Sequence, residues 1–208
     1  MIYELWAEVE TLKSQTNVSE KKVAILASGS GSNAENIIQY FRDNNINASF
    51  IIIANNKEAK VFDRAERLGV PSYYFGRKAF NETGEVKQKL IEFGADLIVL
   101  AGFLWLIPSD LVEAYPNKIV NIHPALLPKY GGKGMYGINV HRAVVEAKEK
   151  ESGITIHYCN QAYDEGAHIL QASCLLDQTE SPEEVAKKVL RLEHKYYPQV
   201  VEDILFNS

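Results

Sequence analysis

An α/β fold, built on a mostly parallel sheet with helices on both faces, is predicted by three features of this sequence. Short apolar runs alternate with amphipathic segments, which is the order of strands and helices in βαβ units. The apolar runs are continuous, as expected of strands buried on both faces. The last third of the chain changes to two strands joined by a polar loop, which indicates an antiparallel C-terminal portion. We therefore expect one Rossmann-like domain.

The predicted elements follow one another from residue 23. Parallel strands are predicted over residues 23–27, 50–54, 71–75, 96–100 and 118–123. Helices are predicted after residue 33 and over residues 59–68, 86–93 and 140–150, with Gly69 and Gly94 as C-terminal stops. The antiparallel pair is predicted over residues 153–158 and 169–176. A capping box at Ser181 and Glu184 begins a long last helix, which we expect Pro198 to interrupt.

Composition excludes several classes of protein. The chain has 208 residues, 46% of them hydrophobic and 24% charged, which is ordinary for a globular domain. A net charge of −5 without a dense basic run argues against a nucleic-acid partner. No apolar run approaches the ~20 residues of a membrane span. Two cysteines, Cys159 and Cys174, are too few for a disulfide scaffold and are expected to be buried thiols. We expect a cytoplasmic protein with no membrane partner.

Residues 1–20 form an extension ahead of the domain predicted over residues 21–208. Apolar residues recur at helical spacing in this extension, at Ile2, Leu5, Trp6, Val9 and Leu12. A short amphipathic helix is therefore expected, and it could dock on the domain, join a dimer contact or fray. The oligomeric state stays open between a monomer and a homodimer.

A glycine-rich turn, residues 28–33, joins the first predicted strand to the first helix. Gly29 and Gly31 allow a tight turn, and the free N–H groups at the helix start attract an anion. With Ala34 the turn also fits the G-x-G-x-x-A form of the dinucleotide fingerprint. That fingerprint requires an acidic residue near the end of the second strand, where this chain has Asn55-Asn56-Lys57. A phosphate monoester is therefore favoured over NAD, and a turn that binds nothing remains the structural alternative.

Asn121 and His123 end the fifth predicted strand. The strand period of two puts them on one side of the backbone, and Pro124 ends the strand after them. An amide donor beside an imidazole suits acyl transfer, because fixed donors stabilise a tetrahedral oxyanion and the ring can transfer a proton. Asp164, in the later polar loop, could face His123 and raise its pKa. The alternative is a polar pair satisfied by neighbouring backbone.

The five histidines show no H-E-x-x-H or paired-cysteine spacing, so no metal site is predicted. His157 lies in an apolar run and is expected to be a satisfied core residue.

Three motifs resemble those of the folate-dependent formyltransferases. They are Asn121-Ile122-His123-Pro124 with the Leu-Leu-Pro-Lys-Tyr after it, Tyr163-Asp164-Glu165-Gly166, and Gly29-Ser30-Gly31-Ser32-Asn33. The last motif narrows the resemblance to phosphoribosylglycinamide formyltransferases. Ala101-Gly102-Phe103, Glu193-His194 and Tyr197-Pro198 are similar to that family as well. The resemblance covers about residues 22–205.

The resemblance implies transfer of a formyl group from 10-formyltetrahydrofolate, as co-substrate, to the amino group of glycinamide ribonucleotide in purine biosynthesis. By similarity, Asn121 would polarise the formyl oxygen, His123 would act as general acid, and Asp164 would support its charge. The ribonucleotide would be held by Gly31, Ser32, Asn33 and Glu193, and the folate by Leu104, Trp105, Leu106, Ile107 and Asn121.

The chain departs from the family pattern at the folate side. Leu104-Trp105 stands where the family often has Met-Arg, and the arginine that often follows the third strand falls near Thr83. Arg77, Lys78 or Lys87 could take over the folate-tail contacts. Residues 131–137, with four glycines, lengthen the loop after Tyr130, and either a mobile flap or an inert surface loop fits them.

Two rival functions stay open. One is formyltetrahydrofolate hydrolase, in which water replaces the amine, and the other is a nucleotide-binding module without catalysis. Methionyl-tRNA formyltransferase is disfavoured by the acidic net charge and by the lack of a basic C-terminal module.

Overall fold

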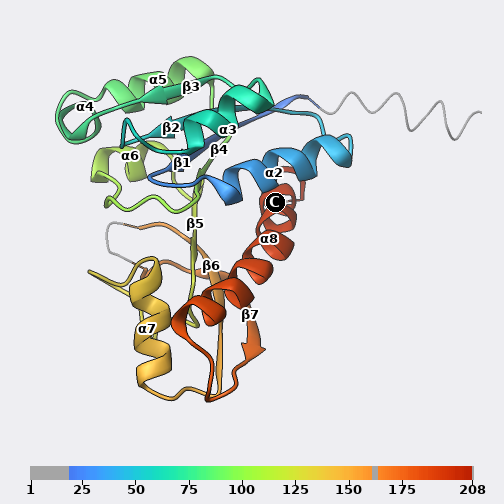
Figure 1. The fold of residues 1–208 in the computed structure, drawn as a ribbon. Helices are drawn as coiled ribbons and strands as arrows, with labels where there is room; N and C mark the ends of the chain where they lie inside the picture. Colours follow the sequence, from blue (N-terminus) through green and yellow to red (C-terminus); the bar gives the residue numbers. More distant parts are fainter. Residues whose placement is uncertain (1–18, 161–163, 208) are drawn as a thin grey trace, which may run out of the picture.

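The computed structural model describes residues 19–160 and 164–207. The extension predicted over residues 1–20 therefore lies almost wholly outside the described residues, as does Tyr163. The described chain forms one sheet of seven strands, surrounded by helices (Figure 1). The strands are β1 (Lys21–Ala27), β2 (Ala48–Ala54), β3 (Ser72–Tyr74), β4 (Leu97–Leu100), β5 (Ile119–His123), β6 (Glu151–Tyr158) and β7 (His168–Leu175).

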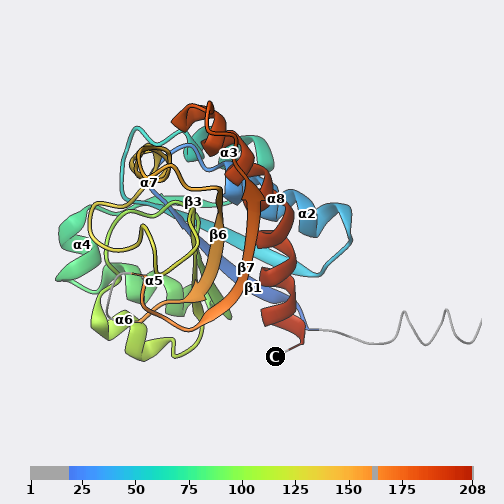
Figure 2. The same ribbon diagram turned by 90° about the horizontal axis from the view of Figure 1, so that it is seen from below.

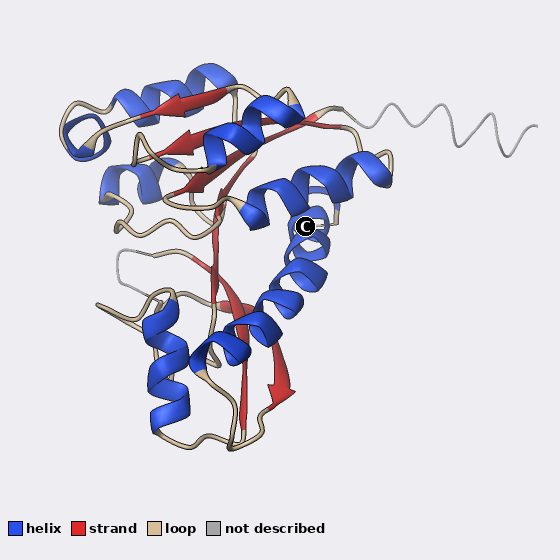
Figure 3. Cartoon of the chain, viewed as in Figure 1, coloured by secondary structure: helices blue, strands red, loops and turns tan. Residues whose placement is uncertain are grey.

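The strand order is β3-β2-β1-β4-β5-β6-β7. The pairs from β3 to β5 are parallel, and β5–β6 and β6–β7 are antiparallel. Figure 3 shows β1–β4 in the upper part of the molecule and β6 and β7 running through the lower part, with β5 between them. The predicted fold class, a mostly parallel sheet with an antiparallel C-terminal portion, is confirmed.

Helices cover both faces of the sheet. They are α2 (Ser32–Asp43), α3 (Val61–Leu68), α4 (Arg77–Asn81), α5 (Glu85–Phe93), α6 (Ser109–Ala114), α7 (Ile138–Glu146) and α8 (Pro182–Phe206). Figure 2 shows the sheet between α2 and α8 on one side and α4, α5 and α6 on the other. Alternate residues of β1 follow this division: Val23 and Ile25 pack in one hydrophobic core, and Ala24 and Leu26 in the other. Because both faces are buried, the strands read as continuous apolar runs.

The last helix begins at the predicted capping box. The Ser181 hydroxyl accepts a hydrogen bond from the Glu184 N–H, and the Glu184 carboxylate accepts one from the Ser181 N–H at 2.8 Å. The predicted interruption at Pro198 is wrong, because α8 continues to Phe206. Proline removes the hydrogen bond to the carbonyl four residues earlier, here that of His194. Asn36 Nδ2 on α2 donates to this carbonyl at 2.7 Å, which supplies the missing partner.

Other differences from the sequence-based expectation are local. The short helices α4 and α6 were not expected, because five or six residues are too few to show a helical period. The structure begins α3 and α7 at Val61 and Ile138, two residues from the expected starts. Within the described part of the chain, no helix has the length and apolar character needed to cross a membrane.

Candidate active site

A cavity of about 360 Å³ opens where the parallel strands end. It is lined by the end of β5, the segment after β4, the start of α2, the loop before α7 and one side chain of α8. The sequence-predicted site residues on its wall are Asn33, Leu104, Trp105, Leu106, Ile107, Asn121, His123, Asp164 and Glu193. Ligands of doubly wound sheets bind at such carboxyl ends, near the point where the strand order reverses. Here that point lies between β1 and β4.

Asn121 lies opposite His157 in the antiparallel pairing of β5 with β6, so the two side chains share one face of the sheet. Asn121 Nδ2 lies 3.1 Å from His157 Nε2, and His157 Nδ1 lies 2.9 Å from the carbonyl oxygen of Tyr158. A carbonyl oxygen can only accept a hydrogen bond. In the neutral form of the His157 ring, Nδ1 therefore carries the proton and Nε2 accepts a hydrogen bond from the Asn121 amide. His157 thereby fixes the orientation of Asn121. Its burial matches the expectation of a core residue, but its role at the site was missed from sequence.

His123 is 3% exposed, and both of its ring nitrogens face acceptors. Nε2 lies 2.8 Å from the carbonyl oxygen of Tyr130, and Nδ1 lies 3.5 Å from Asp164 Oδ2. Burial lowers the pKa of His123 below its ordinary value, although Asp164 and the Tyr130 carbonyl act in the opposite direction. The expected effect of Asp164 is therefore present, but desolvation outweighs it.

Asp164 reaches the site from the loop between β6 and β7. Its Oδ2 accepts a 2.9 Å hydrogen bond from the Gly132 N–H, and its Oδ1 lies 3.5 Å from Asn121 Nδ2. Burial opposes ionisation, but the neighbouring His157 and His123 rings and the Gly132 N–H outweigh it, so the pKa of Asp164 lies below its usual value. A side chain at Gly166 would overlap the carbonyl of Tyr158, so glycine is needed for this loop to pass β6 closely.

The glycine-rich turn begins α2. Gly31 adopts φ 73°, and a Cβ there would collide with Val61 on α3. No side chain caps α2, so the amides of its first turn have no acceptor in the helix. Arg64 Nε donates to the Ser30 carbonyl at 2.7 Å and thereby holds the turn.

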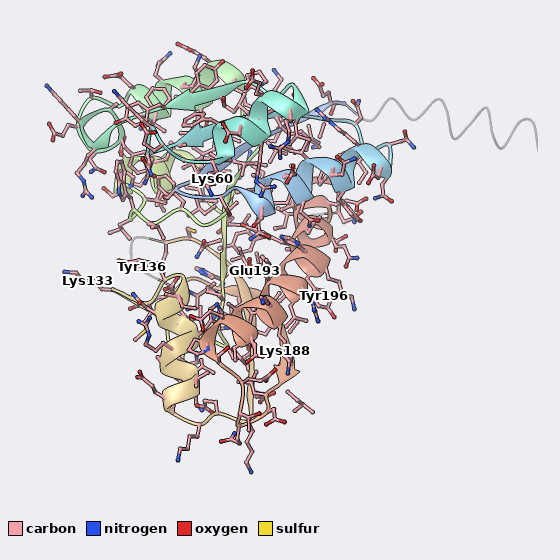
Figure 4. The ribbon with its side chains drawn as sticks, viewed as in Figure 1. Lys60, Lys133, Tyr136, Lys188, Glu193 and Tyr196 are labelled. Atoms are coloured by element: carbon pink, nitrogen blue, oxygen red, sulfur yellow. The ribbon has the colours of Figure 1, made fainter. Side chains whose placement is uncertain are left out.

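Asn33 connects this turn to α8. Its Nδ2 donates to Glu193 Oε2 at 2.6 Å, and its buried Oδ1 has no partner within the described structure. Burial raises the pKa of Glu193 although the hydrogen bond from Asn33 lowers it. In Figure 4, Glu193 points from α8 toward the cavity that it shares with Tyr136 and Lys133 of the loop before α7.

The wall opposite α8 consists of residues 104–107. Leu104 and Leu106 are 47% and 39% exposed, while Ile107 is buried in the core. Trp105 packs edge-on against Phe80 and Phe103, and the guanidinium of Arg77 lies 4.8 Å from its ring centroid. The wall is therefore apolar with one cation beside it.

Sequence reasoning left His141 and His168 unplaced. His141, on α7, lines the cavity, and burial together with nearby His123 lowers its pKa from 6.5 to about 4. His168 is exposed at the start of β7. Among the described residues, no group of three or more histidine, cysteine or acidic side chains is placed to hold a metal ion.

Comparison with known proteins decides the family. A model of the formyl transferase family matches residues 21–201. The chain belongs to that family. A chloroplastic phosphoribosylglycinamide formyltransferase of Arabidopsis thaliana is 42% identical over 87% of this chain, which spans only 64% of the relative's length. The phosphoribosylglycinamide formyltransferase of Bacillus subtilis is 37% identical over 89% of this chain and 95% of its own length.

The solved structures agree with this grouping. The crystal structure of phosphoribosylglycinamide formyltransferase from Bacillus halodurans aligns with a TM-score of 0.81 and 34% identity, covering 89% of this chain and 96% of that chain. This chain is thus a member of the phosphoribosylglycinamide formyltransferase family, whose members are transferases of purine biosynthesis.

Proposed function

We propose that this formyltransferase-family chain transfers the formyl group of 10-formyltetrahydrofolate directly to the amino group of glycinamide ribonucleotide. The observation that carries the proposal is a single cavity bordered by Asn121, His123 and Asp164 at one place and by Asn33 and Glu193 at another. If the phosphate end of a phosphorylated amine is held near Asn33 and Glu193, its amino group would lie near Asn121, His123 and Asp164. That arrangement suits attack of the amine on a formyl carbon.

Each polar group has a proposed task in that attack. The Asn121 Nδ2 contact to Asp164 is long, at 3.5 Å, so this N–H is available to the developing formyl oxyanion. His123 would donate a proton as general acid. A substrate atom that accepts the Nε2–H of His123 would take the place of the Tyr130 carbonyl in that hydrogen bond. Asp164 would stabilise the imidazolium from the Nδ1 side.

The substrates would occupy opposite ends of the cavity. The phosphate would lie at Gly31, Ser32 and Asn33, where the amides at the start of α2 are free, and Glu193 would accept from the ribose hydroxyls. The pterin would lie against residues 104–107, with Asn121 beside it. Of the three cations expected to replace the family's arginines, Arg77 is the one beside Trp105, whereas Lys87 contacts Asp110.

The test is a formyl-transfer assay on the purified protein and its Asn121→Ala and His123→Ala variants. We expect transfer to glycinamide ribonucleotide, with kcat reduced about 100-fold or more in each variant while each variant still unfolds in one cooperative transition. Near-wild-type turnover in either variant would overturn the mechanism. Formate release without glycinamide ribonucleotide would indicate a hydrolase instead. Stabilisation by NAD but not by folate analogues would indicate a nucleotide-binding module.

A further inference from the structure

Lys60 lies directly beside the turn that begins α2. It is the residue before α3, and the next residue, Val61, donates its N–H to the Gly29 carbonyl at 3.2 Å and packs against Gly31. Figure 4 shows the Lys60 side chain at the start of α3, next to the start of α2. A lysine has a long flexible stem, so its ammonium can reach a group bound at the neighbouring amides.

The other cations on this surface already have partners. Arg64 and Arg67 both pair with Glu35, in the first turn of α2, and Lys57 lies 5.1 Å from the ring centroid of Tyr74. The two arginines outweigh the negative charge of Glu35, which would otherwise oppose an anion at this helix start. The Lys60 side chain has no hydrogen bond, ion pair or ring contact within the described part of the chain. Among these four described cations, Lys60 is the one whose side chain has no partner.

The place of Lys60 at the N-cap of α3 is unfavourable for the fold. A cation at a helix N-terminus is opposed by the helix dipole. Its side chain makes no capping hydrogen bond that would offset this effect. Stability therefore gives no reason for a lysine at this position, whereas an anion bound at α2 does.

A ligand at the start of α2 is indicated by a second observation. Asn33 is 7% exposed and lines the cavity, yet its Oδ1 has no hydrogen-bond partner in the described structure. A hydroxyl donor on the ligand would satisfy it. A sugar phosphate carries both a hydroxyl for Asn33 and an anion for the free amides.

We propose that Lys60 is a substrate-binding residue whose ammonium pairs with the phosphate monoester held at the start of α2. The identity of the substrate as glycinamide ribonucleotide rests on the proposed function, but pairing with a phosphate monoester does not. Nearby Glu193 and Asp164 are acidic, so a dianionic phosphate entering this cavity needs a compensating cation. Lys60 supplies that charge without taking part in the chemical step.

The test compares Lys60→Met with Lys57→Met, which removes the same charge three residues away. Ribose 5-phosphate is the binding probe, measured by calorimetry, and steady-state kinetics give kcat and KM for both substrates. For Lys60→Met we expect Kd for ribose 5-phosphate and KM for glycinamide ribonucleotide to rise about tenfold, as for loss of one charge-assisted contact. KM for the folate and kcat should stay within about twofold, and the melting temperature should be equal or higher.

Lys57→Met should change Kd less than about twofold, and Lys60→Arg should restore most of the affinity. Equal Kd and KM in wild type and Lys60→Met, or equal losses in the two methionine variants, would overturn the proposal. The calorimetric comparison separates the two proposals. If the wild type binds ribose 5-phosphate but transfers no formyl group, the proposed function fails while the role of Lys60 is still decided by Kd.

Discussion

Asn36 Nδ2 donates a 2.7 Å hydrogen bond to the carbonyl oxygen of His194, the carbonyl that Pro198 leaves without its helical partner. The bond joins α2 to α8 beside Glu193, which itself accepts from Asn33. Two side chains one turn apart on α2 therefore hold the segment of α8 that faces the cavity. These contacts help to fix the position of Glu193 against α2.

Replacing Asn36 with alanine should lower the free energy of unfolding by about 1–2 kcal/mol, because a partly buried carbonyl loses the side-chain donor that replaces the missing helical one. Urea denaturation measures this loss. Asn44→Ala is the matched control, since Asn44 donates to a carbonyl at an exposed helix end where water can replace it. In a Pro198→Ala background, the restored N–H should reduce the cost of Asn36→Ala. If Asn36→Ala and Asn44→Ala lost equal free energies of unfolding, Asn36 would not be the stabilising donor to the His194 carbonyl.

Gly31→Ala should lower both stability and phosphate affinity. The new Cβ meets Val61, and an alanine at φ 73° is strained by roughly 1–2 kcal/mol. Gly29→Ala is the control, because a Cβ there meets no atom within 4 Å. Melting curves with and without ribose 5-phosphate give both effects. A Gly31→Ala protein with wild-type melting temperature and ligand shift would show that the turn tolerates a side chain.

Asp164→Asn should lower the pKa of His123 further, because it removes the negative charge that favours the imidazolium. The pKa can be followed by NMR titration of the histidine ring carbons, with His123→Asn used to assign the signal. Asp177→Asn removes a carboxylate from the exposed segment after β7 and should leave that signal unchanged. A His123 titration that is identical in Asp164→Asn would remove Asp164 from the proposed role.

The buried ring of His141 should make stability depend on pH. Its pKa is about 4 in the folded protein and 6.5 as an ordinary value, so the unfolded chain takes up the proton first as pH falls. The neutral ring thus contributes stability fully above about 6.5, and this contribution is lost as pH falls through about 4. Between pH 7 and pH 5 the loss is about 2 kcal/mol.

Chemical denaturation of wild type and His141→Gln isolates this contribution, because the variant should lose about 2 kcal/mol less over the same pH range. His168→Gln removes an exposed histidine and should behave as wild type does. Parallel pH profiles for wild type and His141→Gln would contradict the lowered pKa.

Local sequence determined the strands, most helices and the relation of Asn121 to His123, because these depend on periods within a few residues. The capping box at Ser181 is likewise a pattern within a few residues and could be predicted from local sequence. The strand register was not determined in this way, and a shift by one residue would turn His157 away from Asn121. For that reason His157 looked like an ordinary core residue.

What only the tertiary structure decided depends on contacts between distant segments. From the sequence, Pro198 predicts an interruption of α8. In the structure the helix continues, because Asn36, 158 residues from His194, supplies the missing donor. The pKa of His123 follows from its burial, which no local pattern reveals and which outweighs the charge of Asp164. Sequence thus indicated which groups could react, and packing determined their orientation and protonation, because desolvation and hydrogen bonding act between segments brought together by the fold.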